Sequence, residues 1–451
     1  MAKVSIIVTV YNGAKYLPKL LTNLSQKATK EVQVVVVDDG STDQSFVIAL
    51  GFKEFFHNYT LKKLDTNMGV GNARNIGMEL SIGDYLYFLD CDDWISGSFL
   101  SGVEFDPSAG SDLVLSPVRK QVSNSSNESY LSALASAEHG NRQDFLSISM
   151  STESWPGECW GLFLRREFLE KHQIRFKSVL IAEDMAFMTE VSLNMTSYSI
   201  SKSPVYIHIH FAGSLGKSFS NQNINSWFRA MLSVVNLAQK YPPTSLEGVF
   251  IIQRLAWSCA YFLVSLILSD IKSQHQFLEK VVIENVIPNH GKLGLVDGIA
   301  VLGKLAQVED RAFLKSESFL EKLTLNARNA VKSISGLANS KNIYLYCYDR
   351  LSMGVCKLML DQNISVSGII DDNADFIVEN KSLNVKLLSS GELSQELLQG
   401  SIIVVCHDKS SVFHTIDKRL RSEKIDDLKV VNFTTIDFVN GVPFFDWLKS
   451  D

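Results

Sequence analysis

The chain has 451 residues, 46% of them hydrophobic, which is enough for two to four domains with packed cores. Its formal net charge is −6, so no general basic field gathers nucleic acid, and we expect no nucleic-acid partner. The six cysteines are scattered without a Cys-x-x-Cys pair, which indicates reduced thiols and a cytoplasmic location.

The N-terminal residues predict a strand rather than a signal peptide. The apolar run 4–10 is short, has no small-residue cleavage site and breaks at Tyr11-Asn12-Gly13. Residues 255–268 are continuously apolar apart from serine and cysteine, but they are fewer than the roughly 20 needed to span a bilayer. We expect a buried core helix there, with docking at the inner face of the membrane as the alternative.

The first hundred residues have an ordered α/β pattern. A β-branched run at 4–10 is followed by apolar residues at helical spacing over 14–26, and a second buried run at 32–37 ends at Asp38-Asp39. Strand, helix and strand in this order predict a right-handed parallel βαβ unit. Ligands of such sheets bind at the carboxyl ends of the strands, so we expect the residues that follow these strands to share one crevice.

A third apolar run, 85–89, ends in Asp90-Cys91-Asp92-Asp93. Three carboxylates within four residues repel one another, and a cation or a hydrogen-bond network has to offset that repulsion if they are buried. Mg²⁺ and Mn²⁺ prefer such oxygen ligands. The cluster therefore predicts a metal site at a strand end, with Asp93 supporting local structure; a solvated acidic turn is the alternative.

Between the second and third of these strands lies the glycine-rich segment 67–77. Its glycines allow a close approach of the backbone, and Arg74 falls in the first turns of an expected helix, which suits contact with a nucleotide or its phosphates. A flexible loop with a surface arginine is the alternative.

These segments together resemble the inverting family 2 glycosyltransferases of bacterial type, over residues 1 to about 215. The motifs that carry the resemblance are Ser5-Ile-Ile-Val-Thr-Val-Tyr11-Asn12, Val37-Asp38-Asp39-Gly40-Ser41-Thr42-Asp43, Asn67-x-Gly69-x-Gly71-x-Ala73-Arg74-Asn75-x-Gly77, Asp90-x-Asp92-Asp93 and Ala182-Glu183-Asp184. The resemblance implies an α/β domain with the GT-A fold over residues 1–220, a nucleotide-sugar donor that is UDP-linked, and Mn²⁺ or Mg²⁺ as cofactor.

The resemblance also implies site residues. Asp92 holds the metal on the diphosphate, with His210 as a further candidate ligand. Those assigned to the donor nucleotide or its sugar are Thr9, Tyr11, Asp39, Asn67, Arg74, Asp90, His208 and Ser214. Relatives frequently carry arginine where this chain has His208, so the role of this side chain toward the diphosphate depends on pH.

The chemistry needs a base, because an acceptor hydroxyl that attacks the anomeric carbon must lose a proton. Glu183-Asp184 matches the acidic pair of the family, so Asp184 is the expected base and Glu183 orients the acceptor or supports the site. A second carboxylate nucleophile is not evident, which predicts inversion at the anomeric carbon. An acidic pair that only stabilises a helix N-terminus is the alternative.

Two aromatic segments are open to different interpretations. Trp155 and Trp160 lie where many relatives place acceptor-binding aromatics, and packing in the core is an equal alternative. Alternation over 204–210 puts Tyr206, His208 and His210 on one strand face, where either histidine could contact the metal or the diphosphate, or only pack.

The remaining chain carries fewer motifs. The polar stretch 108–141 predicts a variable acceptor-side insertion, and 221–339 is mainly helical. Residues 340–451 predict a small Rossmann-like α/β domain whose first turn lacks most of the expected glycines. We therefore expect a structural role for it, or a homo-oligomer or partner-protein contact, rather than dinucleotide binding.

The sequence predicts a metal-dependent inverting glycosyltransferase acting on a glycan, glycolipid or glycoprotein acceptor. Two alternatives stay open: a non-catalytic nucleotide-sugar-binding scaffold, and a sugar-phosphate nucleotidyltransferase. The latter usually opens with a glycine-rich basic loop, where this chain has Tyr11-Asn12-Gly13-Ala14-Lys15.

Overall fold

The computed structural model describes the chain in segments, and all statements below concern these residues. They are 3–97, 110–120, 125–137, 140–152, 154, 156–179, 181–209, 221–238, 240–242, 244–251, 254–255, 258, 328–329, 331–332, 334, 342–346, 350–371, 385–389, 392–394, 398–406, 410–422 and 428–433. The chain divides into two compact units. The N-terminal unit comprises Met1–Ser218 and Arg229–Ile251, and the C-terminal unit comprises Phe219–Phe228 and Ile252–Asp451.

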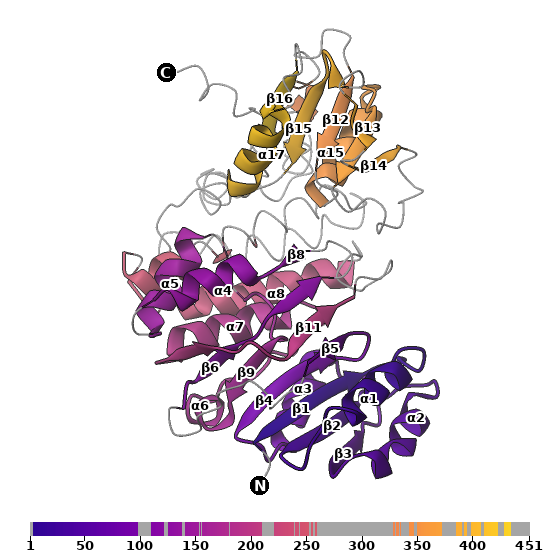
Figure 1. The fold of residues 1–451 in the computed structure, drawn as a ribbon, viewed down its shortest axis with the longest axis vertical. Helices are drawn as coiled ribbons and strands as arrows, with labels where there is room; N and C mark the ends of the chain where they lie inside the picture. Colours follow the sequence, from indigo (N-terminus) through magenta and orange to yellow (C-terminus); the bar gives the residue numbers. More distant parts are fainter. Residues whose placement is uncertain are drawn as a thin grey trace, which may run out of the picture. The chain divides into compact units, whose positions relative to one another are not determined.

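The N-terminal unit is built on a seven-stranded sheet with the order β10-β6-β9-β4-β1-β2-β3 (Figure 1). The strands are β1 (Val4–Val10), β2 (Val32–Asp38), β3 (Asn58–Lys63), β4 (Tyr85–Asp90), β6 (Leu113–Leu115), β9 (Leu162–Arg165) and β10 (Tyr198–Ile200). β1 pairs in parallel with β2 and with β4, so chain order reverses between β1 and β4. This reversal is the switch point at which open α/β sheets bind ligands.

A second sheet of four short strands adjoins the first, in the order β5-β11-β7-β8. Its strands are β5 (Trp94–Ser96), β7 (Val118–Lys120), β8 (Ser125–Ser126) and β11 (Val205–His208). β5 follows β4 after the acidic cluster, so this sheet continues from the end of the third apolar run.

Residues 108–141 are not the insertion that the sequence predicts. β6 lies between β10 and β9 inside the main sheet, and β7 pairs with β11 in the small sheet. The expectation was wrong because a strand of three residues is too short to show a period of two, and the polar residues around β6 hide it.

Amphipathic helices cover the main sheet. The helical segments of the N-terminal unit are α1 (Leu17–Ser25), α2 (Ser45–Gly51), η1 (Lys53–Phe55), α3 (Val70–Glu79), α4 (Glu128–Ala135), α5 (Arg142–Ser151), α6 (Arg166–Lys171) and α7 (Glu183–Asn194), and α8 (Asn221–Ala238) contributes its C-terminal part. In α1, Leu17, Leu20, Leu21 and Leu24 are buried, which is the spacing that packs one helix face on a sheet. β1 and β2 are buried along their whole length, as expected for central parallel strands.

The C-terminal unit contains the α/β module expected from the sequence. Its described strands and helices are β12 (Ile343–Tyr346), α15 (Arg350–Asp361), β13 (Gly368–Asp371), β14 (Leu387–Ser389), β15 (Ile402–Cys406), α17 (Ser410–Ser422) and β16 (Lys429–Phe433). All pairs are parallel, in the order β14-β13-β12-β15-β16. With β12 at the centre and the chain winding outward on both sides, this is a doubly wound, Rossmann-like sheet.

The first turn of this module, 347–349, and most of the expected helical region 221–339 lie outside the described residues, as does most of the apolar run 255–268. Of the helices that the structure describes, none has both the length and the apolar composition that a membrane crossing requires.

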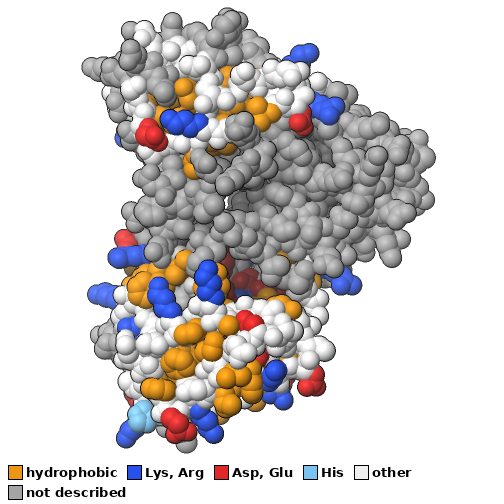
Figure 2. All heavy atoms as spheres, turned by 90° about the vertical axis from the view of Figure 1, so that its right-hand side faces the viewer, with side chains coloured by type: hydrophobic (Ala, Val, Ile, Leu, Met, Phe, Trp, Pro, Cys, Tyr) orange, Lys and Arg blue, Asp and Glu red, His pale blue; other side chains and the backbone are white. Residues whose placement is uncertain are grey.

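Figure 2 shows one face of the molecule, on which the N-terminal unit carries several hydrophobic patches with Lys, Arg, Asp and Glu side chains interspersed. The large apolar side chains with half or more of their surface exposed in this unit include Val47, Leu50, Phe55, Met68 and Ile82.

Candidate active site

The ends of β1, β2 and β4 meet, as the sequence predicts. Val10 is paired with Asp38, and Thr9 with Asp90. The loops that follow β1 and β2 are also tied together, because the Asn12 side chain accepts a hydrogen bond from the backbone N–H of Thr42 at 2.9 Å, and Ser45 Oγ accepts one from the backbone N–H of Gly13 at 2.9 Å. These hydrogen bonds hold together, at one edge of the sheet, two motifs that are about 30 residues apart in the sequence.

Asp39 supports the neighbouring glycine-rich loop. Its two carboxylate oxygens accept hydrogen bonds from the backbone N–H groups of Met68 and Gly69, at 2.7 and 2.9 Å, and the residue is 3% exposed. Asn67 Oδ1 also accepts from Gly69 N–H, at 3.0 Å. Both side chains therefore shape the start of α3, and their contacts with a nucleotide stay predictions.

Tyr11 is 48% exposed at the end of β1, which leaves its ring accessible for stacking on a base. Thr9 is 8% exposed, inside the sheet and opposite Asp90. Of the expected donor-binding side chains described so far, Thr9 and Asp39 are buried, whereas Tyr11 and Asn67 are exposed.

Arg74 connects three carboxylates that lie far apart in the sequence. Its Nη1 donates to Glu183 Oε1 at 2.5 Å and to Asp184 Oδ1 at 2.8 Å, and its Nη2 donates to Asp90 Oδ1 at 2.8 Å. The Arg74 side chain is 4% exposed. We call Arg74, Asp90, Glu183 and Asp184 the arginine cluster; it brings the expected base to the end of β4.

The electrostatics of the arginine cluster fit proton transfer. Burial raises the pKa of Glu183 to about 7, and the neighbouring Asp184 charge adds to this, while Arg74 opposes it. Burial also raises the pKa of Asp184, and Arg74 again opposes the rise. A carboxylate with a raised pKa near a site of bond formation is suited to accept a proton.

Asp92 is partly exposed and makes no hydrogen bond or ion pair with another residue in the described part of the chain. Burial and the charges of Asp93 and Asp90 raise its pKa to about 6, which shows that a nearby positive charge would be favourable. Asp92 thus fits the expected metal ligand.

The described residues contain no group of three or more His, Cys, Asp and Glu side chains placed to hold a metal. His210, the other expected ligand, lies outside the described residues, as do Ser214 and Trp155.

Asp93 has the structural role expected of it. Its Oδ2 accepts from Tyr206 Oη at 2.6 Å and lies 3.0 Å from His208 Nδ1, and its Oδ1 accepts from the backbone N–H of Ile209 at 2.7 Å. Asp93 is 3% exposed, so it joins the acidic cluster to β11 through buried hydrogen bonds.

Replacing Asp93 by asparagine should destabilise the N-terminal unit by about 3 kcal/mol, because an amide nitrogen would face buried donors that now share one carboxylate. Urea unfolding followed by tryptophan fluorescence measures the change. The control is Asp65→Asn at an exposed position, which should change the free energy of unfolding by no more than about 0.5 kcal/mol. Equal stabilities of the two variants would contradict this role of Asp93.

His208 and Trp160 belong to one packed group. The Trp160 ring stacks on Tyr206 at 4.8 Å and on His208 at 4.9 Å between centroids, and Trp160 is 8% exposed. Of the two interpretations of Trp160, core packing describes its position. Tyr206 and His208 share a strand face, as the alternation predicts.

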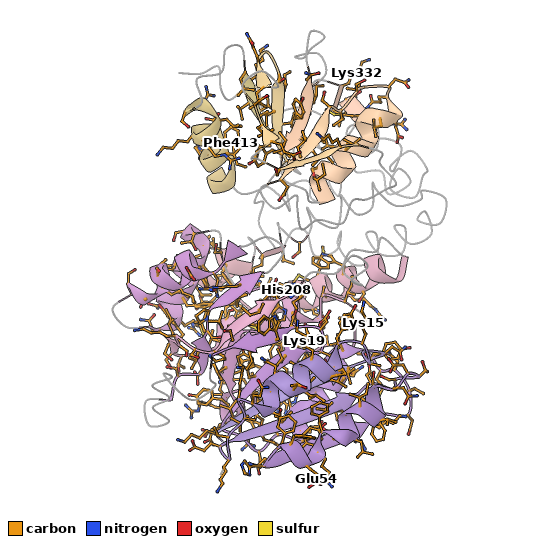
Figure 3. The ribbon with its side chains drawn as sticks, turned by 45° about the vertical axis from the view of Figure 1, so that its right-hand side comes forward. Lys15, Lys19, Glu54, His208, Lys332 and Phe413 are labelled. Carbon is orange, nitrogen blue, oxygen red and sulfur yellow. The ribbon has the colours of Figure 1, made fainter. Side chains whose placement is uncertain are left out.

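Figure 3 labels His208 on β11 and Lys19 on α1. The Lys19 ammonium lies over the ring of Trp94 in β5, the strand that pairs with β11.

Two contacts of this site could not be predicted from the sequence. Burial raises the pKa of the Cys159 thiol, the Arg74 charge opposes this rise, and the Asp184 charge adds to it. Asn75 bonds with the backbone of Phe176. Both contacts join segments far apart in the sequence, 85 residues for Arg74 and Cys159 and 101 for Asn75 and Phe176. Only a motif in each partner could have indicated them, and neither Cys159 nor Phe176 belongs to one.

Comparison with known proteins agrees with this geometry. Residues 5–172 match the family model described as glycosyl transferase family 2. The chain is 39% identical over 98 residues to the glycosyltransferase GlyA of Streptococcus pneumoniae, which covers 22% of this chain and 14% of that protein. It is 26% identical over 250 residues to the uncharacterized glycosyltransferase YibD of Escherichia coli, covering 53% of this chain and 70% of the relative. Curated relatives such as GlyA and EpsH of Bacillus subtilis are matched over 14% and 59% of their length.

Solved structures support the fold. The structure of S. aureus TarS 1-349 in complex with UDP-GlcNAc has a TM-score of 0.51 and 20% sequence identity, and the match covers 71% of this chain and 92% of that one. The same TarS segment in complex with UDP has a TM-score of 0.50. The expected GT-A type of α/β fold is thereby confirmed.

Proposed function

We propose that this chain, whose residues 5–172 belong to glycosyl transferase family 2, is an inverting, metal-dependent glycosyltransferase that uses a UDP-linked sugar. The observation that carries the proposal is the arginine cluster, which holds a partly exposed Asp184 beside Asp90 at the switch point of the sheet. If Glu183 and Asp184 only stabilised the N-terminus of α7, there would be no reason for them to lie at the end of β4, where ligands of α/β sheets bind.

The donor lies across the ends of β1, β2 and β4 in this proposal. Tyr11 stacks on the base, Asp90 faces the ribose or the donor sugar, and Asp92 would hold Mn²⁺ or Mg²⁺ beside the diphosphate. When bound, the cation offsets the negative charge that develops on the departing nucleoside diphosphate.

Asp184 then removes the proton from the attacking acceptor hydroxyl as the oxygen bonds to the anomeric carbon and the bond to the diphosphate breaks. Glu183 shares the Arg74 guanidinium with Asp184, so it supports the orientation of the base. A single displacement of this kind inverts the configuration at the anomeric carbon.

The acceptor is a glycan, glycolipid or glycoprotein. Partial relatives include a teichoic acid poly(glycerol phosphate) polymerase of Staphylococcus epidermidis and a poly(ribitol-phosphate) beta-N-acetylglucosaminyltransferase of Staphylococcus aureus, which favours a cell-surface polymer or its lipid-linked precursor. Such an acceptor places the chain in the cytoplasm at the inner face of the membrane. The C-terminal module serves as a contact for a second copy or a partner protein.

A donor panel tests the proposal. Thermal stabilisation of the full chain should be measured with UDP-GlcNAc, UDP-glucose, UDP-galactose and GDP-mannose, each with Mn²⁺ and with EDTA. A ligand at about 100 times its Kd adds roughly 2.7 kcal/mol to the stability, so a binding donor is readily detected. We expect at least one UDP-sugar to stabilise the chain, and more strongly with Mn²⁺. No stabilisation by any UDP-sugar, or an effect that EDTA leaves unchanged, would argue against the proposal.

A further inference from the structure

Helix α3 is clamped to the segment that leads to the expected base. The Asn75 side chain donates to the backbone carbonyl of Phe176 at 3.0 Å and accepts from the backbone N–H of Phe176 at 2.9 Å. Asn72 Nδ2 also donates to Ser178 Oγ, at 3.1 Å. Two hydrogen bonds from one amide fix both the position and the direction of the backbone at Phe176.

Gly71 lets the helix come this close. A Cβ atom at Gly71 would lie 2.9 Å from the carbonyl oxygen of Lys177 and 3.4 Å from Glu183 Cβ. Any other residue would push the segment 177–183 away from α3, so this glycine serves protein packing rather than a close approach to phosphate.

Two aromatic rings, Phe176 and Phe187, also join the arginine cluster to α7. The Arg74 guanidinium lies 5.3 Å from the centroid of the Phe176 ring, and this ring stacks on Phe187 of α7 at 3.9 Å with an interplanar angle of 4°. The Phe176 ring therefore contacts both the Arg74 guanidinium and α7, the helix that carries Asp184. Its two Nη atoms then bind Asp184 and Asp90 at the same time.

We propose that Arg74 and Asn75 are positioning residues for the base, which fix Asp184 relative to Asp90, rather than ligands of the donor nucleotide. The inference rests on the proposed function and reassigns Arg74. Its side chain is 4% exposed and shared among three carboxylates, so a diphosphate would have to displace these partners to reach it. A lysine cannot replace the planar fork, because its single ammonium group is a point charge.

The test is a comparison of Arg74→Lys and Asn75→Ala with the unchanged chain, using the donor that stabilises it best. We expect kcat to fall about 30-fold or more for Arg74→Lys and about 10-fold for Asn75→Ala, because small displacements of a catalytic group are costly. The donor KM and the Kd for UDP with Mn²⁺ should stay within about twofold in both variants.

The pH profile adds a second readout. Asp184 is faced by Arg74, Glu183, Asp90, Cys159 and Glu158. Arg74 is the one positive charge of this set and lowers the pKa of Asp184. A lysine holds its charge in a weaker contact, so the pKa of Asp184 should rise and the acid limb of kcat should move to higher pH in Arg74→Lys. Arg166→Lys, which alters an ion pair with Glu170 outside the cluster, is the matched control and should leave kcat, KM and the pH profile unchanged.

A donor KM or UDP Kd raised tenfold or more with kcat unchanged would overturn the inference and restore Arg74 as a donor ligand. If Arg74→Lys does not fold, Asn75→Ala decides, and an unchanged kcat there overturns the inference as well. Failure of the proposed function looks different, since the unchanged chain would then release no UDP from any donor.

Discussion

Replacing Asp184 by asparagine should reduce sugar transfer by about 10³-fold or more in kcat while donor binding stays within about twofold. The substitution keeps the shape of the side chain but removes the proton acceptor, and a positioned general base contributes roughly 10²–10⁴ to the rate. Steady-state kinetics and calorimetry with UDP in the presence of Mn²⁺ measure the two effects separately.

Two comparisons make this experiment specific to the base. Asp65→Asn, on the surface of the same unit, should retain full activity. Glu183→Gln should reduce kcat less than Asp184→Asn, since Glu183 shares Arg74 but is not the proton acceptor. Undiminished transfer by Asp184→Asn, or a larger effect of Glu183→Gln, would move the base away from Asp184.

Replacing Asp92 by alanine should weaken UDP binding in the presence of Mn²⁺ about 100-fold, or roughly 2.7 kcal/mol. Asp92 is the carboxylate of the acidic cluster that has no ion pair or hydrogen bond to another residue in the described part of the chain. Burial, with the charges of Asp93 and Asp90 added to it, raises its pKa to about 6, and a bound cation would lower this pKa again. Stability should change little, because no partner is lost.

The control for Asp92 is Asp361→Ala, at an exposed position at the end of α15 in the other unit. The difference in UDP affinity between Mn²⁺ and EDTA should be large in the unchanged chain and in this control, and small in Asp92→Ala. If Asp92→Ala binds UDP with Mn²⁺ as tightly as the unchanged chain, Asp92 is not the metal ligand.

The central part of the sheet was predictable because the physics is local. β1, β2 and β4 are mostly apolar, buried strands of six or seven residues. β2 and β4 end in an aspartate, β1 is followed by Tyr11-Asn12, and parallel pairing brings these ends to one edge. The different roles of Asp92 and Asp93 were only partly predictable. The sequence indicates a supporting role for Asp93, but its buried contacts are with β11, a strand more than 100 residues later in the chain.

Long-range contacts set the limit of sequence reasoning at this site. The pattern around Arg74 predicts a helix and an anion contact, and the structure adds that the anions are protein carboxylates. The charge of an arginine does not reveal its partner when several acids are candidates. Likewise Trp160 could be a sugar platform or a core residue from its sequence alone, and burial against Tyr206 decides for the core.

The release of UDP by the full chain is the most direct test of the account. The chain and Asp184→Asn are each incubated with the best-binding UDP-sugar, Mn²⁺ and a lipid-linked or polymeric glycan acceptor, and UDP and the extended acceptor are quantified. We predict UDP and extended acceptor in equal amounts from the unchanged chain and neither above background from the variant. Equal release by both proteins, or pyrophosphate formed from a nucleoside triphosphate and a sugar 1-phosphate instead of UDP, would contradict the account.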